Sequence, residues 1–154
     1  MAPFSAEIWR LTLDAASWRL AGAGQEWVVA AGEDPAVALA GLGDAARPRK
    51  GRLEVELADA WLRYLVIEWP AGVSGRAERE AWVTERFRSV HGAGAAEWVI
   101  GVDRGAVGNT ALTSAAPRAL VEALTRFAAD RQLRIVALRG SFVAAYNRLQ
   151  ARPS

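Results

Sequence analysis

The residues whose types and spacing best suggest chemistry form the turn Asp14-Ala15-Ala16-Ser17, which lies between two apolar runs. An acid, small residues and a hydroxyl directly after a first strand could let main-chain amides approach a phosphate group. The same residue types also make ordinary turns, because short polar side chains hydrogen-bond to nearby amides. The turn therefore either binds a nucleotide or only reverses the chain.

Catalytic groups are few elsewhere in the chain. Asp59, Glu68 and Asp103 lie near predicted strand ends, but no Ser-His pair or second carboxylate accompanies them in sequence. The chain has no cysteine and one histidine, which excludes thiolate nucleophiles, cysteine metal sites and histidine clusters. It also lacks the phosphate loop G-x-x-x-x-G-K-S/T. We expect a protein that is not an enzyme, without a cofactor or a metal site.

A basic loop, RPRKGR at 47–52, could meet phosphate groups in nucleic acid or on a membrane. Pro48 and Gly51 also fit a solvated connector, and the loop holds few cations for nucleic-acid binding. The formal net charge is only +2, and basic residues alternate with acids along the chain. We therefore expect the loop to be a connector and expect no binding to nucleic acid.

Tryptophan is abundant, and two tryptophans bracket a mixed polar and aromatic segment. Trp61 and Trp69 flank Arg63, Tyr64 and Glu68, a combination of residue types that is enriched at protein interfaces. These five residues are candidates for binding a partner. The alternative is that the aromatic rings cover sheet edges within the fold.

At 154 residues, the chain has the size of one ordinary domain. With 52% hydrophobic and 23% charged residues, its composition is typical of a soluble globular protein. No run approaches the roughly 18 apolar residues of a membrane-spanning helix, and residues 1–10 lack the pattern of a signal peptide. We expect a single domain over residues 1–154, in the cytoplasm and without a membrane span.

The first third of the chain predicts an antiparallel meander followed by a short helix. Apolar runs at 7–13, 17–22 and 26–31, with short connections, are typical of three antiparallel strands. Asp34 followed by Pro35 is a helix-start signal. The buried side of this helix is expected to carry Val37, Ala38, Leu42 and Ala45.

The middle third predicts a hairpin and a longer helix. Residues 52–70 combine strict apolar alternation with a later β-branched and aromatic run, which predicts a second strand that is central and buried on both faces. A helix is expected from a Ser74 cap to His91, with Gly92 as its stop. Its buried side is expected to carry Val83, Phe87 and Val90.

The last third predicts strands at 97–103 and 110–116, a helix from Pro117, a strand at 134–140 and a final helix capped by Ser141. The Pro117 helix is expected to bury Leu120, Leu124 and Phe127. The order of elements predicts an α/β fold of mixed sheets, with an antiparallel meander and about four helices.

Two stretches resemble the actin-like cytoplasmic proteins of pilus and secretion machines, which include the type IV pilus assembly protein PilM and the cytoplasmic domain of type II secretion protein L. The first is ELADAWLRYLVIEWPAGVSGRAEREAWVTERFRSVHG at 56–92, with an aromatic-Pro pair before an acidic helix. The second is TSAAPRALVEALTRFAADRQLRIVALRGSFVAAYNRLQ at 113–150, which is similar to the strand, long helix, strand and return helix closing the first lobe. The resemblance covers most of the chain and implies the first lobe of an actin-like (ribonuclease H-like) fold.

The resemblance also concerns the Asp14 turn. The first phosphate loop of actin-like ATPases reads approximately Asp-x-Gly-Ser/Thr-x-x-x-Lys, so Asp14 and Ser17 match as degenerate candidates. Ala16 stands in place of the glycine, Trp18 follows at once and the loop is shorter, which implies a turn that does not bind phosphate. ATP binding in the family also needs a second lobe, which would begin after residue 150.

The resemblance implies a non-enzymatic adaptor or scaffold in a type IV pilus or type II secretion-like assembly platform, peripheral to the inner membrane through its partners. The expected partners are the cytoplasmic tail of a PilN-like bitopic inner-membrane protein and an assembly ATPase. Such a tail could add to a sheet edge or lie in a groove. The chain is either a natural single lobe or a truncated one, and a truncated lobe would expose apolar surface and favour self-association into a homo-oligomer. Two alternatives stay open: a nucleotide-binding protein completed by a partner chain, and an unrelated small α/β interaction domain.

Overall fold

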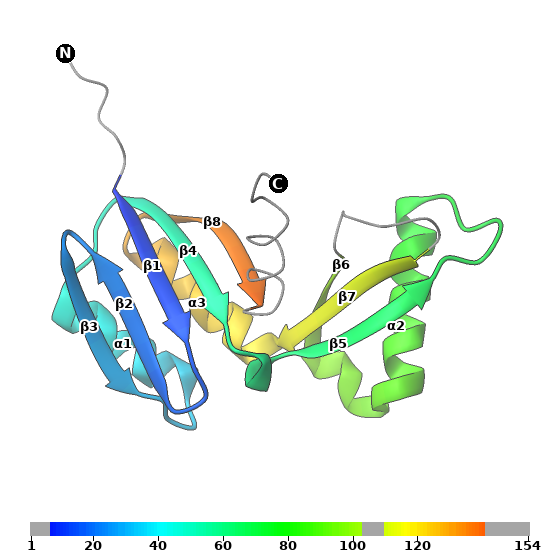
Figure 1. Cartoon of the computed structure of the whole chain (residues 1–154), viewed down its shortest axis with the longest axis horizontal. Coiled ribbons are helices and arrows are strands. Elements are labelled where there is room, and N and C mark those ends of the chain that lie inside the picture. Colours follow the sequence, from blue (N-terminus) through cyan, green and yellow to red (C-terminus); the bar gives the residue numbers. More distant parts are fainter. Residues whose placement is uncertain (1–6, 103–109, 141–154) are drawn as a thin grey trace, which may run out of the picture. The chain divides into compact units, whose positions relative to one another are not determined.

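The computed structural model describes residues 7–102 and 110–140, which belong to two compact units (Figure 1). Unit 1 takes in the described residues up to Trp61 and from Ala119 onward, and unit 2 is the contiguous segment Leu62–Arg118. The final helix expected after Ser141 lies outside the described residues. The expectation of a single domain over the whole chain stays a prediction.

Unit 1 contains a five-stranded mixed sheet in the order β3-β2-β1-β4-β8, with β1 at its centre. The first three strands form the antiparallel meander that the sequence predicts, whereas β4 and β8 add in parallel. The helices α1 (Pro35–Ala46) and α3 (Arg118–Asp130) lie on one face of this sheet (Figure 1). The strands are β1 (Ile8–Leu13), β2 (Ser17–Gly22), β3 (Gln25–Ala30), β4 (Gly51–Leu57) and β8 (Leu133–Gly140).

Alternation along the strands of unit 1 separates apolar from charged side chains. The register places Trp9, Leu11 and Leu13 of β1 beside buried residues of its two neighbours, namely Trp18, Leu20, Leu53, Val55 and Leu57. Successive side chains of a strand point to opposite faces. The other face therefore carries the charged residues, including the ion pairs Arg10–Glu54 (3.3 Å) and Arg19–Glu26 (3.2 Å).

The helices of unit 1 begin where the sequence predicts. The Asp34 carboxylate accepts a hydrogen bond from the Ala36 amide (2.9 Å) and caps α1, with Pro35 at the first helical position. The face of α1 that packs on the sheet differs from the prediction, because it is made by Ala38, Leu39, Leu42 and Gly43. Val37 is 68% exposed and Ala45 is also exposed, since both lie outside that row.

The third helix, α3, matches its prediction. It starts directly after Pro117, as expected for a proline that opens a helix. Leu120, Leu124 and Phe127 are buried, and their i, i+4, i+7 spacing forms one apolar stripe. This stripe completes the core of unit 1.

Unit 2 contains an antiparallel three-stranded sheet in the order β5-β7-β6, with α2 (Arg76–His91) packed on it. A short 3₁₀ helix, η2 (Ala93–Glu97), follows α2 and contacts it. The strands are β5 (Arg63–Glu68), β6 (Trp98–Val102) and β7 (Thr110–Pro117). The buried cluster of this unit comprises Ile67, Val83, Phe87, Ala95, Ala111 and Ala115.

The predicted hairpin at 52–70 is wrong, because its two strands belong to different sheets. β4 pairs in parallel with β1 and β8, and the 3₁₀ helix η1 (Asp59–Trp61) separates β4 from β5. Among the described strands of unit 2, β5 lies at the edge of the sheet, and Val66 on it is 66% exposed. The apolar run of β5 therefore marks neither a central strand nor one that is buried on both faces.

Two details of α2 also differ from the prediction. Its N-cap is Gly75, and the preceding Ser74 contributes its main-chain amide, which donates to the Glu78 carboxylate (3.3 Å). The buried contact comes from the i, i+4 pair Val83 and Phe87, whereas Val90 is exposed. The predicted stop at Gly92 is confirmed: this residue has a φ of +81°, which glycine adopts readily.

The packing of Trp9 predicts the effect of two glycine substitutions. A Cβ at Gly22 would meet the ring of buried Trp9, whereas a Cβ at Gly32 would meet nothing within 4 Å. Gly22→Ala should therefore lower the free energy of unfolding by about 1–3 kcal/mol through overpacking. Gly32→Ala should leave it unchanged or raise it by about 0.4–1 kcal/mol. Urea denaturation followed by far-UV circular dichroism measures both, and equal losses would contradict the Trp9 contact.

Candidate functional site

The Asp14 turn closes on its own main chain. The Asp14 amide donates to the Ser17 carbonyl (3.0 Å), and the Ala31 amide from the end of β3 donates to the Ala16 carbonyl (2.9 Å). The turn has a third hydrogen bond, in which the indole Nε1–H of Trp61 donates to the Asp14 carbonyl (3.1 Å). The Asp14 amide already donates a hydrogen bond within the turn. It could donate to a phosphate group only if its hydrogen bond to the Ser17 carbonyl were broken.

Trp18 lies beneath this turn and not in it. The register that pairs Trp18 with Leu13 directs the ring to the helix-covered face, where it is fully buried. The Trp18 ring therefore does not occupy the space above the turn, and the expectation that the turn binds no phosphate stays a prediction. Trp61 meets the buried ring edge-on, with centroids 5.7 Å apart and an angle of 74° between the planes. Trp61 thus joins η1 to both the turn and the core of unit 1.

The candidate partner residues are divided between the two units. Trp61 belongs to unit 1, whereas Arg63, Tyr64, Glu68 and Trp69 belong to unit 2. Alternation along β5 also directs Tyr64 and Glu68 to the opposite face from Arg63. The sequence segment 61–69 is therefore not one continuous patch within either unit.

Two of these candidates take part in contacts between arginine and tryptophan. The Arg63 guanidinium lies 5.1 Å from the centroid of the Trp98 ring, and that of Arg79 lies 5.2 Å from the centroid of Trp69. Trp69 also packs against the buried cluster of unit 2. These rings therefore contribute to the internal packing of unit 2, as the edge-covering alternative expects for Trp69.

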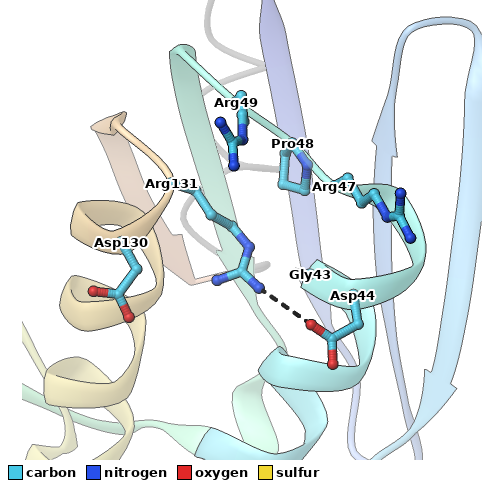
Figure 2. A pocket seen from close by; sticks show the side chains of 7 residues that line it. All are labelled: Gly43, Asp44, Arg47, Pro48, Arg49, Asp130 and Arg131. Carbon is cyan, nitrogen blue, oxygen red and sulfur yellow. Dashed lines mark ion pairs between the residues drawn. The ribbon is translucent and has the colours of Figure 1, made fainter.

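The basic loop lines a cavity of about 440 Å³ in unit 1 (Figure 2). The loop connects α1 to β4, as expected, and sequence reasoning missed that the end of α3 lies opposite it. Figure 2 shows Arg131 reaching from that end toward α1, where its guanidinium faces Asp44 at 3.9 Å. The cavity, here called the arginine cavity, is lined by Gly43, Asp44, Arg47, Pro48, Arg49, Asp130 and Arg131.

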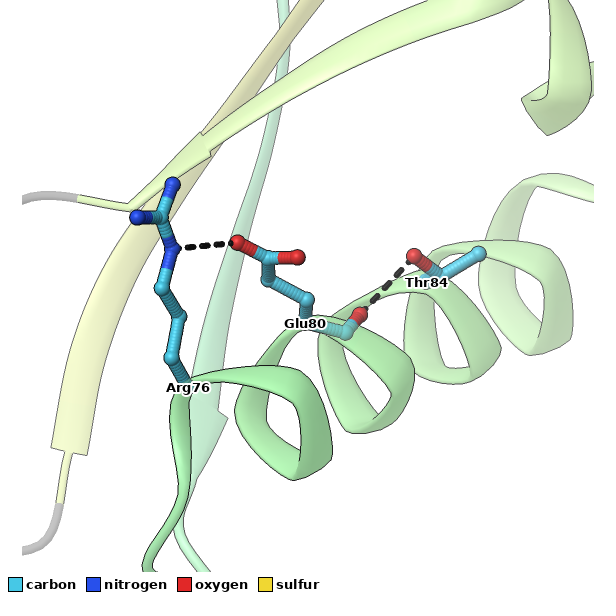
Figure 3. A network of polar contacts seen from close by, with 3 residues as sticks. All are labelled: Arg76, Glu80 and Thr84. Atoms are coloured by element: carbon cyan, nitrogen blue, oxygen red, sulfur yellow. Dashed lines mark hydrogen bonds and ion pairs between the residues drawn. The ribbon is translucent and has the colours of Figure 1, made fainter.

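A second hollow, of about 300 Å³, lies between α2 and β6 in unit 2. Its walls are largely apolar, with a carboxylate and a guanidinium among the lining residues, and we call it the α2–β6 groove. Figure 3 shows the α2 wall, where Arg76 pairs with Glu80 (2.9 Å) and the Thr84 hydroxyl donates to the Glu80 carbonyl (2.9 Å). The lining residues are Glu80, Val83, Thr84, Ala95, Ala96, Trp98, Val99, Ile100, Val102 and Arg118.

β6 borders this groove and is an edge strand. It pairs with β7 on one side, and among the described residues no strand pairs with it on the other. Alternate main-chain amides and carbonyls of an edge strand point away from the sheet and can pair with an added strand. The groove therefore combines main-chain pairing groups with apolar walls.

Over residues 7–102 and 110–140, no group of three or more His, Asp or Glu side chains could hold a metal ion. No helix within those same ranges has the length and apolar character needed to cross a membrane.

No family model and no curated protein matches this sequence. Solved structures do match. A chain of the "PilM-PilN type IV pilus biogenesis complex" gives a TM-score of 0.62 at 15% identity over 96% of this chain. "Cyto-EpsL" is the cytoplasmic domain of an inner-membrane component of the Vibrio cholerae type II secretion system, and it gives a TM-score of 0.61 at 16% identity over 88% of this chain. A Bacteroides thetaiotaomicron protein of unknown function with an actin-like ATPase fold gives 0.59 at 9% identity over 99%.

This chain has an actin-like fold. The predicted fold class is thereby confirmed, and the two secretion and pilus proteins among the matches are those that the sequence resembles. The chain spans 51% of the length of the matched pilus protein chain, 57% of Cyto-EpsL and 60% of the Bacteroides protein. The actin-like elements described above therefore correspond to a little more than half of each matched chain.

The role of Trp61 in the Asp14 turn predicts a graded loss of stability. Trp61→Phe removes the hydrogen bond to the Asp14 carbonyl but keeps an aromatic edge against Trp18, so it should cost about 1 kcal/mol. Trp61→Ala removes both contacts and should cost roughly 2 kcal/mol. Urea denaturation followed by far-UV circular dichroism gives both values. A Trp61→Phe protein as stable as the parent would show that the indole hydrogen bond does not hold the turn.

Proposed function

We propose that this chain is a non-enzymatic adaptor of an inner-membrane assembly platform of the type IV pilus or type II secretion kind. The observation that carries the proposal is the fold likeness over 88% and 96% of the chain to components of such systems. The adaptor acts on the cytoplasmic side and is held near the membrane through its partners. An assembly ATPase is a further partner in this proposal.

The hydrogen bonds of the Asp14 turn argue against the nucleotide-binding alternative. The Asp14 amide donates a hydrogen bond to the Ser17 carbonyl, and the Asp14 carbonyl accepts one from the Trp61 indole. Phosphate-binding turns need free main-chain amides and commonly a lysine. The only lysine of this sequence is Lys50, in the loop before β4 and not in the turn.

The proposed ligand is the cytoplasmic tail of a bitopic membrane protein, bound as an extended segment in the α2–β6 groove. A tail in this position adds a strand to the edge of β6 that no described strand occupies, which supplies main-chain hydrogen bonds. Its alternate side chains enter the groove against Val83 and Ile100. β5, which holds most of the candidates from the sequence, is also an edge strand, but its Glu68 carbonyl already accepts the Trp82 indole (3.1 Å).

Isothermal titration calorimetry on the full chain tests the proposal. We expect no heat of binding with Mg·ATP and measurable binding of a synthetic peptide with the tail sequence of a candidate membrane partner. ATP binding that Asp14→Ala abolishes would contradict the adaptor proposal and favour the nucleotide-binding alternative.

A matched pair of variants tests the position of the peptide. Thr84→Arg adds a long cationic side chain to the wall of the groove and should weaken peptide binding at least about ten-fold, which corresponds to about 1.4 kcal/mol. Ser89→Arg adds the same side chain to an exposed position of α2 outside the groove and should leave affinity unchanged. If Val66→Arg on β5 weakens binding and Thr84→Arg does not, the tail binds at β5.

A further inference from the structure

Arg131 in the arginine cavity is held by packing and only weakly by charge. Its guanidinium lies 4.6 Å from the centroid of the Phe127 ring, and a Cβ at Gly43 would collide with it, so the group rests directly on the backbone of α1. The Asp44 carboxylate is 3.9 Å away and 85% exposed, whereas the Arg131 side chain is 21% exposed. Exposed ion pairs of this length contribute little energy, so the fixed guanidinium keeps most of its capacity for an anion.

The loop on the opposite side of the cavity has a fixed backbone. Arg47 is the C-cap of α1, with a φ of +49° and its amide bonded to the Gly43 carbonyl (2.8 Å). The Lys50 amide donates to the Arg131 carbonyl (3.1 Å), which ties the loop to the end of α3. The side chains of Arg47 and Arg49 therefore start from defined positions on the cavity wall.

More arginines than acidic residues line this cavity. Within residues 7–102 and 110–140, neither Arg47 nor Arg49 forms an ion pair, and Asp44 faces only Arg131. Asp130 is exposed, and no ion pair joins it to Arg131 (Figure 2). Three arginines thus line this hollow, and among the described residues two of them lack an ion-pair partner.

We propose that the arginine cavity binds the phosphate group of an anionic lipid headgroup or of a small soluble phosphate compound. Guanidinium groups match phosphate oxygens with paired hydrogen bonds, and three arginines line this one cavity. The cavity volume of about 440 Å³ accommodates a phosphate with a small substituent. Nucleic acid is disfavoured, because none of the lining residues is aromatic and the cations do not form an extended track.

Two binding assays on the full chain distinguish the two sources of phosphate. The first is an NMR titration with inorganic phosphate at low salt. The second is cosedimentation with vesicles of phosphatidylcholine, with and without phosphatidylglycerol. Arg47→Ala and Arg49→Ala should each weaken binding about five-fold, the loss expected for one cation near an anionic surface. Arg126→Ala, which removes the same charge from an exposed position of α3 outside the cavity, should leave binding unchanged.

Gly43→Ala tests the contribution of Arg131 without removing any charge. Its added methyl group displaces the Arg131 guanidinium, so phosphate binding should fall by a similar factor while circular dichroism shows a folded protein. If the cavity variants lose binding only in the vesicle assay, the ligand is a lipid headgroup. If they lose binding only in the phosphate titration, the ligand is a soluble phosphate compound. The proposal is overturned if neither probe binds, if Arg126→Ala weakens binding equally, or if only a single-stranded oligonucleotide binds. None of these outcomes depends on tail binding in unit 2.

Discussion

The parallel pairing of β1 with β4 is the interaction on which unit 1 depends. It aligns Leu13 with Leu57 at the ends of the two strands, so the turn after β1 and the short helix after β4 emerge at the same edge of the sheet. The Ala58 amide donates to the Leu13 carbonyl (2.9 Å) and continues this pairing by one residue. Trp61 can reach the Asp14 carbonyl only because of this alignment. A shift of one residue would turn the apolar layer to the charged face and separate these groups.

Local patterns predicted the elements of this chain well and their long-range partners poorly. The Asp34-Pro35 signal and the Leu120 stripe depend on neighbours within a few residues, so a single sequence reveals them. The partners of β4 lie far along the chain, and no local pattern tells whether β5 pairs with β4 or with β7. The actin-like fold was predicted from the order of elements together with a resemblance spread over most of the chain.

The same distinction applies to the candidate sites. Arg47 and Arg49 were visible as a basic loop, but the cavity also needs Arg131, which folding brings from the end of α3. The α2–β6 groove had no recognisable motif, because its walls are ordinary core and edge residues of two elements. The two sites differ in chemistry as well: arginines line one, and apolar walls beside the outer strand of the described β5-β7-β6 sheet line the other.

Unit 2 interrupts unit 1 in the chain, and this order matters while the protein is being synthesised. The ribosome completes β1 to β4 first, then the whole of unit 2, and only afterwards α3 and β8. Until then, β4 lacks its second parallel neighbour and the apolar layer of unit 1 lacks the Leu120, Leu124 and Phe127 cover. The described strands of unit 2 and its helix α2 are all synthesised by residue 117, so this unit can fold before the unit that surrounds it in sequence. Nascent unit 1 must therefore remain incomplete, with an exposed strand edge, through the translation of the entire insertion.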